Sequence, residues 1–110
     1  MSESSQLDRT LAALADPQRR RTIDLLRERP RRAGELAQAL NLPPPAMSRH
    51  LRVLRQSGLV EERHPDSDLR VRIYALRPEP MAALRAWLEQ AEQGWNEQLA
   101  AFKEHLEAAE

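Results

Sequence analysis

Hydrophobic residues in the first forty positions recur every three or four residues, which is the spacing of a helix with one buried face. This pattern predicts a first helix near residues 6–15, with apolar positions Leu7, Leu11, Leu14 and Ala15. Asp16 and Pro17 suit the N-cap and the first position of a second helix, which extends to about residue 29. A third helix is expected over residues 33–40, with one apolar face formed by Leu36, Ala37 and Leu40.

A short break at residues 41–44, rich in proline, separates the third helix from a fourth. Proline is excluded from a helix interior but can open a helix, so the fourth helix is expected from Pro45 to Gln56. Its apolar positions, Met47, Leu51 and Leu54, lie on one face. Gly58 closes this helix, because glycine adopts the left-handed backbone that commonly ends one.

Two segments with alternating polar and apolar residues follow, at 59–63 and 69–76, around a turn-forming stretch at 64–68. They predict a β-hairpin. In the second strand Leu69, Val71, Ile73 and Ala75 are expected on one face, and Arg70, Arg72 and Tyr74 on the other.

The last third of the chain, from about residue 80 to residue 108, is expected to form one long helix. Its apolar residues are three or four positions apart throughout: Met81, Leu84, Leu88, Ala91, Trp95, Leu99, Phe102 and Leu106. Such a stripe packs either on its own domain or on a second copy of the chain. Because the helix is roughly 40 Å long, it exceeds what a small domain can cover, and the length favours a homodimer.

Charge is unevenly distributed, although the net charge of the 110 residues is zero. Residues 17–77 contain fourteen arginines and seven acids, whereas residues 1–16 and 78–110 are both net acidic. A basic middle is typical of a surface that meets nucleic acid.

Features of an enzyme are absent from the sequence. There is no cysteine, no glycine-rich phosphate loop and no nucleophile elbow, and His50, His64 and His105 lie on three different elements. We expect no catalysis, no cofactor and no metal site. No apolar run of about 18 residues and no signal peptide is present, which predicts a cytoplasmic protein without a membrane span.

The helix–turn–helix at residues 33–56 is the strongest functional signal, because a helix presented over a tight turn can enter the major groove of DNA. Ser48, Arg49 and Arg52 lie away from the apolar stripe of the second helix, as a base-reading surface requires. The hairpin adds further cations that can reach phosphates or the minor groove, namely Arg63, Arg70 and Arg72.

Four segments together resemble the ArsR-type family of winged helix-turn-helix repressors. They are Ala15-Asp16-Pro17 with the following arginine-rich helix, Gly34-Glu35-Leu36-Ala37, residues 45–55 and Ser57-Gly58-Leu59-Val60. The resemblance covers about residues 10–78 well and the final helix in kind. It implies a single mainly α domain over residues 1–110, with five helices, a helix-turn-helix at 33–56 and a two-stranded wing at 59–76.

The resemblance also implies partners and sites. It implies a homodimer, joined by helices 6–15 and 80–108, that binds an inverted repeat in double-stranded DNA. By position the base-reading residues are Pro44, Met47, Ser48 and Arg49, and Arg63, Arg70 and Arg72 lie on the wing. His50 either contacts a base or helps to seat the helix. The dimer interface takes in Leu7, Leu11, Leu84, Leu88, Ala91, Trp95, Leu99 and Phe102.

Two departures from the family pattern narrow these expectations. Pro43-Pro44 stands where the family often has Ser-Gln, so the usual N-cap and a common base-contacting amide are missing. The cysteine pair of the metal-sensing members is also missing, which favours the metal-independent branch. The resemblance further implies a repressor that regulates its own gene. One alternative is an effector- or metal-responsive sensor, its unknown effector bound near Trp87 and Trp95. The other is a protein–protein interaction module that does not bind DNA.

Overall fold

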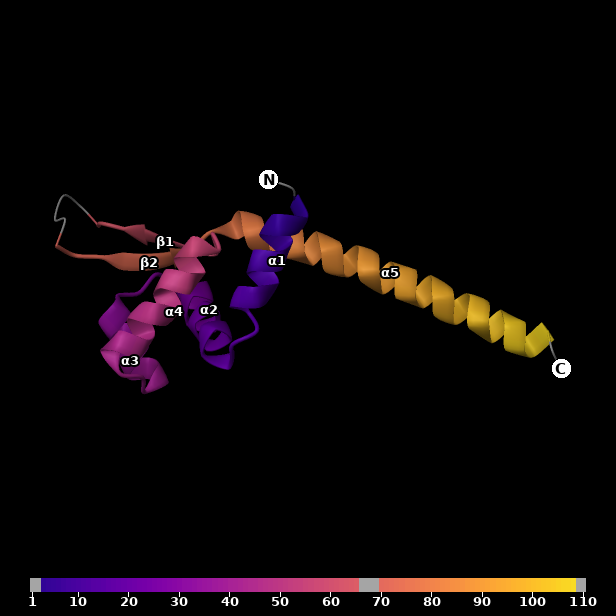
Figure 1. Cartoon of the computed structure of the whole chain (residues 1–110), viewed down its shortest axis with the longest axis horizontal. Coiled ribbons are helices and arrows are strands. Elements are labelled where there is room, and N and C mark those ends of the chain that lie inside the picture. Colours follow the sequence, from indigo (N-terminus) through magenta and orange to yellow (C-terminus); the bar gives the residue numbers. More distant parts are fainter. Residues whose placement is uncertain (1–2, 66–69, 109–110) are drawn as a thin grey trace.

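The protein, described by a computed structural model over residues 3–65 and 70–108, consists of a small body and one projecting helix (Figure 1). In the body, helices α1 (Glu3–Ala13), α2 (Pro17–Glu28), α3 (Ala33–Leu40) and α4 (Pro44–Gln56) precede strands β1 (Val60–Arg63) and β2 (Ile73–Leu76). Helix α5 (Pro78–Ala108) then leads away from it. The described residues therefore confirm five helices and one two-stranded antiparallel sheet.

The hydrophobic core lies where α2, α3, α4 and the sheet meet. Its most deeply buried large side chains are Leu36, Met47, Leu54 and Leu59. Each helix contributes the apolar face that its sequence spacing predicts, so the buried stripes of α3 and α4 are confirmed. The core fixes α4 against the sheet and leaves the opposite face of α4 in solvent.

The corner between α1 and α2 is closed by hydrogen bonds to backbone groups that the helices leave unpaired. Asp16 is the N-cap of α2, and its Oδ1 accepts from the N–H groups of Gln18 at 2.7 Å and Arg19 at 3.2 Å. At the other side of the corner, Arg19 Nε donates to the carbonyl of Ala13 at 2.6 Å. The predicted start of α2 at Pro17 is confirmed, while α1 ends at Ala13, two residues earlier than expected.

Helices α4 and α5 both begin earlier than the sequence suggested, at Pro44 and Pro78 instead of residues 45 and 80. The physical reason is the same in both cases. Proline lacks only an N–H group that the first turn cannot use, and its fixed φ is already helical. Pro43, with no side-chain hydrogen bond to offer, is the N-cap of α4.

The predicted hairpin is present, but its second strand is shorter than residues 69–76. Residues 66–69 lie outside the described part of the chain, and so does the expectation for Leu69. Tyr74, which alternation places on the same face of the strand as Arg70 and Arg72, is buried in the core, whereas the two arginines are exposed. Its backbone explains this position: Tyr74 N donates to the carbonyl of Arg31 at 2.8 Å, so β2 is covered by the α2–α3 linker.

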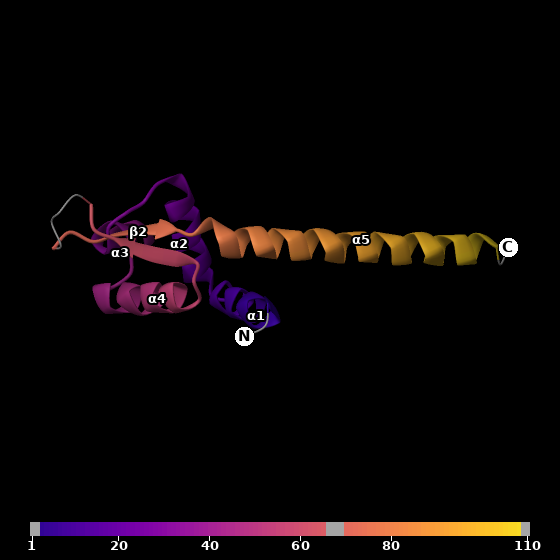
Figure 2. The same ribbon diagram turned by 90° about the horizontal axis from the view of Figure 1, so that it is seen from above.

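Helix α5 gives the molecule its elongated shape, which measures 70 × 31 × 23 Å. The radius of gyration is 19.2 Å, whereas a compact domain of about 100 residues has about 13 Å. Seen from above, α5 leaves the body as one straight rod beyond α1 (Figure 2). No helix within the described residues has both the length and the apolar composition needed to cross a membrane.

Candidate nucleic-acid interface

The turn between α3 and α4 is short and rigid. Asn41 ends α3 in the left-handed conformation, at φ 55°, and its N–H donates to the carbonyl of Gln38 at 3.2 Å. Leu42 N donates to the carbonyl of Ala37 at 2.9 Å, and the carbonyl of Pro43 accepts from Met47 N at 3.1 Å. These bonds present the N-terminal end of α4 at one end of the body.

The two faces of α4 differ sharply. Met47, Leu51 and Leu54 are buried, whereas Pro44, Ser48, Arg49 and Arg52 are exposed. Neither Arg49 nor Arg52 forms an ion pair with a residue that the structure describes. The structure therefore brings most of the predicted base-reading residues together on one open face, with two uncommitted guanidinium groups.

Met47 is the exception among the predicted DNA-contacting residues. Its side chain is only 1% exposed and belongs to the core, so it cannot reach a base. Two expectations applied to Met47: its place in the apolar stripe of α4 predicted a buried side chain, and the family resemblance implied a contact with a base. The observed burial agrees with the first expectation. Met47 holds α4 in place instead of reading DNA.

His50 is half-buried on the side of α4 that faces the start of α2. Partial burial acts to raise the pKa of the Asp16 carboxyl. The N–H groups of Gln18 and Arg19 and the positive charges of His50 and Arg19 outweigh that effect and hold this pKa below its usual value. The nearness of His50 to the α2 N-cap favours the expectation that it seats α4 over the expectation that it contacts a base.

The wing carries its predicted arginines, but two of them are paired with wing glutamates. Arg63 Nε donates to Glu61 Oε1 at 2.7 Å, and Arg72 Nε lies 3.2 Å from Glu62 Oε1. Arg70 is exposed near the tip. The hairpin that carries these three arginines lies at the end of the molecule opposite the C-terminus (Figure 1).

Glu62 and Arg55 are the site residues that sequence reasoning missed. Glu62 is a β1 residue whose side chain is 16% exposed, and its Oε2 also lies 3.2 Å from Arg55 Nη2 of α4. It is a positioning residue, because it holds one arginine from each of the two elements. An acid on a strand that faces a basic strand is the signal that could have identified it, since opposite charges pair across antiparallel strands.

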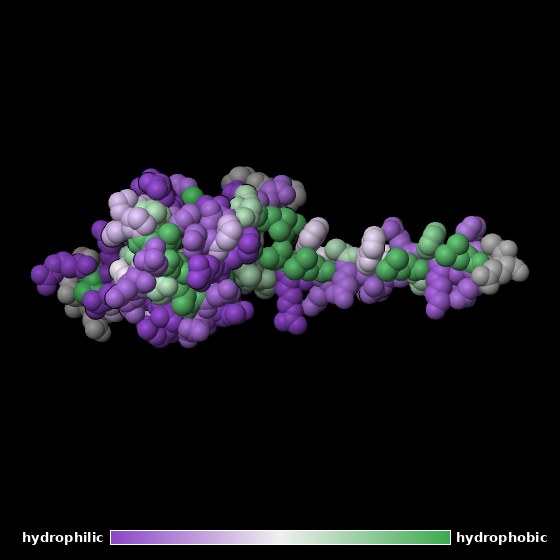
Figure 3. Space-filling model, turned by 90° about the horizontal axis from the view of Figure 1, so that it is seen from below, coloured by the Kyte–Doolittle hydropathy of each residue, from purple (hydrophilic) through white to green (hydrophobic). Residues whose placement is uncertain are grey.

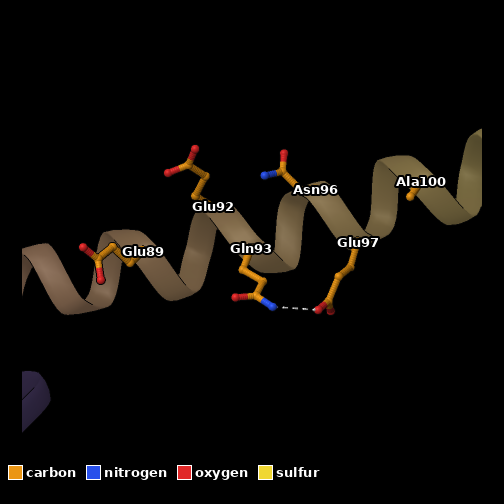
Figure 4. A pocket seen from close by; sticks show the side chains of 6 residues that line it. All are labelled: Glu89, Glu92, Gln93, Asn96, Glu97 and Ala100. Carbon is orange, nitrogen blue, oxygen red and sulfur yellow. Dashed lines mark hydrogen bonds between the residues drawn. The ribbon is translucent and has the colours of Figure 1, made fainter.

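A strongly acidic flank lies far from this surface, on the projecting part of α5. Figure 4 shows six of its side chains, with Gln93 Nε2 donating to Glu97 Oε1 at 3.3 Å. Its acids, Glu89, Glu92 and Glu97, would repel phosphates. Among the described residues no three His, Cys, Asp or Glu side chains gather closely enough to hold a metal ion.

A helix-turn-helix with an exposed arginine-bearing second helix and a basic β-hairpin defines a winged-helix DNA-binding regulator. The comparisons with known proteins agree with this class. Residues 16–62 match the bacterial regulatory protein family arsR. The HTH-type transcriptional regulator Rv2034 of Mycobacterium tuberculosis is 35% identical over 108 residues, which cover 98% of this chain and 95% of that protein. The chain belongs to the ArsR family and is a DNA-binding transcriptional regulator.

Two further relatives bear on mechanism. The transcriptional repressor SdpR of Bacillus subtilis is 32% identical over 56 residues, which are 51% of this chain and 62% of SdpR. The homodimeric winged helix-turn-helix DNA-binding domain of Mb0332, a possible ArsR-family transcriptional regulator of Mycobacterium bovis, is similar in structure, with a TM-score of 0.65 and 26% identity. That likeness covers 89% of this chain and 93% of the Mb0332 chain.

Proposed function

We propose that this protein is a homodimeric repressor that binds an inverted-repeat operator in double-stranded DNA. The observation that carries the proposal is the open face of α4, where Ser48, Arg49 and Arg52 stand free opposite the buried stripe. Arginine can form two hydrogen bonds to a guanine edge, and serine accepts or donates to several bases. The first residue of α4, Pro44, offers an apolar contact to the same groove.

The wing acts beside α4 in this proposal. Arg63, Arg70 and Arg72 contact phosphates or the adjacent minor groove, which sets the register of α4 without reading sequence. The glutamate partners of Arg63 and Arg72 keep these two side chains ordered and reduce the net positive charge of the wing. Such contacts give binding that weakens as salt rises.

Dimerisation explains why α5 leaves its own body. All residues from 85 to 108 are exposed in the single chain, including Trp95 at 61% and Phe102 at 60%. Figure 3 shows the apolar side chains following α5 along its length. Of the predicted interface, Leu84 is buried within its own chain, at 8% exposed, and is set aside. Leu7 is half-buried, and the remaining predicted interface residues are exposed: Leu11, Leu88, Ala91, Trp95, Leu99 and Phe102.

A twofold dimer presents two α4 helices, one to each half-site, which is the symmetry that an inverted repeat requires. The homodimeric state of the Mb0332 domain supports this assembly. Repression is the regulatory mode that the name of SdpR supports, and we place the protein in the cytoplasm, where a bacterial operator lies. We further propose that it acts on the promoter of its own gene.

The test is binding of the purified protein to the DNA upstream of its own gene, compared with a scrambled duplex, at two salt concentrations. Arg49→Ala and Arg52→Ala should each weaken specific binding by about 1–3 kcal/mol if they read bases. Arg85→Ala is the matched control, because it removes the same charge from α5, where it pairs with Glu89. Equal, weak binding to both duplexes would reject the claim that the upstream DNA contains the operator. Unchanged affinity in both α4 variants would reject the claim that this face of α4 reads bases.

A further inference from the structure

An open groove of about 760 Å³ lies where α5 leaves the body. Its walls come from the residue that follows α1, from α2, from the end of β2 and from the first turns of α5. The floor is apolar and the rim is cationic, with Asp24 as its one acid among the described lining residues: Leu14, Arg20, Ile23, Asp24, Arg27, Leu76, Arg77, Pro78 and Met81.

The rim arginines are held in place by neighbours. Arg20 Nη1 donates to the carbonyl of Leu14 at 2.7 Å, and Arg27 Nη2 lies 3.4 Å from Asp24 Oδ1. Arg77 Nε lies 3.9 Å from Glu79 Oε2. The arrangement leaves a net positive rim around an apolar floor, which fits an apolar segment with acidic flanks.

The C-terminal turns of α5 are such a segment. Leu99, Phe102 and Leu106 are exposed apolar residues at spacings of three and four. Glu97, Glu104 and Glu107 flank them, against Lys103 as the one basic residue among 97–108 apart from His105. This tail cannot reach the groove of its own chain, because α5 is one continuous helix that points away from it.

The stripe of α5 is symmetric about residues 93–94. Leaving aside Leu84, which is buried within its own chain, three pairs of stripe residues are equally far from this centre to within one position, namely Met81 with Leu106, Leu88 with Leu99, and Ala91 with Trp95. Two antiparallel copies would bring each pair face to face. The central pair then sets the smallest stripe residue against the largest, which favours close packing. Parallel copies would instead set the indole of Trp95 against itself and bring the acidic tails together.

We propose that the groove binds the C-terminal turns of α5 from a second copy of this chain, with Leu106 beside Met81 and the tail glutamates beside the rim arginines. The inference rests on the proposed homodimer and deepens it, because it names the partner segment and its binding site. Each dimer contains two such contacts, one at each end of the α5 pair.

Disulfide cross-linking tests the proposal in a chain that has no cysteine of its own. A disulfide needs Cα atoms about 4.4–6.8 Å apart, so only facing positions can be joined. The variant Met81→Cys/Leu106→Cys should give a covalent dimer on oxidation. Along one helix these positions are roughly 37 Å apart, so no bond can form within a chain. The exposed pair Leu88→Cys/Leu99→Cys tests the same register without touching the groove.

Matched controls separate the outcomes. Met81→Cys/Leu99→Cys, which are not opposite, and each single variant should stay uncross-linked. Cross-linking of Leu106→Cys alone would mean a parallel pair and would overturn the proposal. A dimer in sedimentation that fails to cross-link through Met81→Cys/Leu106→Cys would overturn the groove contact and leave the proposed homodimer standing. A monomer in sedimentation of the unmodified protein would reject the homodimer and the groove contact together.

Discussion

Arg55 in α4 and Glu62 in β1 form an ion pair, with Arg55 Nη2 3.2 Å from Glu62 Oε2. The other oxygen of the same carboxylate lies 3.2 Å from Arg72 Nε. One glutamate therefore connects the helix proposed to read bases with the wing proposed to contact the backbone. Because its side chain is largely buried, the pair is less screened by solvent than an ordinary surface ion pair.

Glu62→Gln should raise affinity for DNA of any sequence, because it removes a negative charge from the DNA-facing surface and releases two arginines. The ratio of specific to scrambled binding should fall, since α4 and the wing are no longer held in register. Fluorescence anisotropy with both duplexes at two salt concentrations measures this. Glu61→Gln, which releases only Arg63, is the control. Weaker binding of both duplexes by Glu62→Gln would contradict the positioning role.

Met47 and Arg49, two residues apart on α4, should affect different properties. Met47→Ala removes a core side chain and should lower the free energy of unfolding by about 2–5 kcal/mol. Arg49→Ala should leave stability within about 0.5 kcal/mol, because its side chain is exposed and unpaired among the described residues. Urea denaturation and operator binding, measured on both variants, separate core from interface. A clear loss of stability in Arg49→Ala would contradict the assignment of Arg49 to the DNA interface and not to the core.

Asp16→Ala should destabilise the protein by about 1 kcal/mol, because it removes the side-chain cap of α2. The pH dependence follows from the lowered pKa of the Asp16 carboxyl. Its contribution is complete above the pKa of the unfolded chain and is lost as pH falls through the lower folded value. Denaturation from pH 7 to pH 3 should therefore show the difference between unmodified protein and variant shrinking with acid. A difference that grows at low pH would have the wrong sign.

Gly58 and Gly34 should respond oppositely to alanine. Gly58 has φ +82°, so Gly58→Ala should cost about 1–2 kcal/mol through backbone strain, although its added Cβ would meet Gln6 at an ordinary 3.8 Å. Gly34 lies inside α3, with nothing within 4 Å of a built Cβ. Gly34→Ala should stabilise by roughly 0.5–1 kcal/mol. Thermal denaturation of the two variants gives the comparison, and a neutral Gly58→Ala would count against the strained C-terminus of α4.

Helix caps and the spacing of apolar residues predicted most of this fold, because both signals agree along the chain. Asp16-Pro17 starts α2, Gly58 closes α4, and the spacing of apolar residues gives the buried faces of α3 and α4. Tyr74 could not be placed in this way. Its burial depends on backbone pairing with Arg31, forty-three positions earlier, and alternation within a strand carries no information about such a partner.

In the proposed DNA-reading face, too, local patterns predicted some residues, whereas others depend on contacts between elements. The exposure of Ser48, Arg49 and Arg52 follows from helical periodicity, which is local. The roles of Glu62 and His50 depend on contacts between elements, with Arg55 and with the α2 N-cap. A half-buried histidine and a strand glutamate look alike in sequence whether they position other groups or face solvent. Only their neighbours distinguish these roles.

The junction between β2 and α5 has a mechanical consequence. Arg77 alone separates Leu76, the last residue of β2, from Pro78, the first of α5, and its N–H donates to the carbonyl of Leu59 at 2.9 Å. With no slack at this joint, α5 is a rigid lever arm whose fulcrum is the base of the wing. A sideways force at its far end would be transmitted to the base of the hairpin and to α1, on which α5 packs. A contact that displaces the C-terminal end of α5 would therefore change how the wing meets DNA in the proposed complex, without contacting α4.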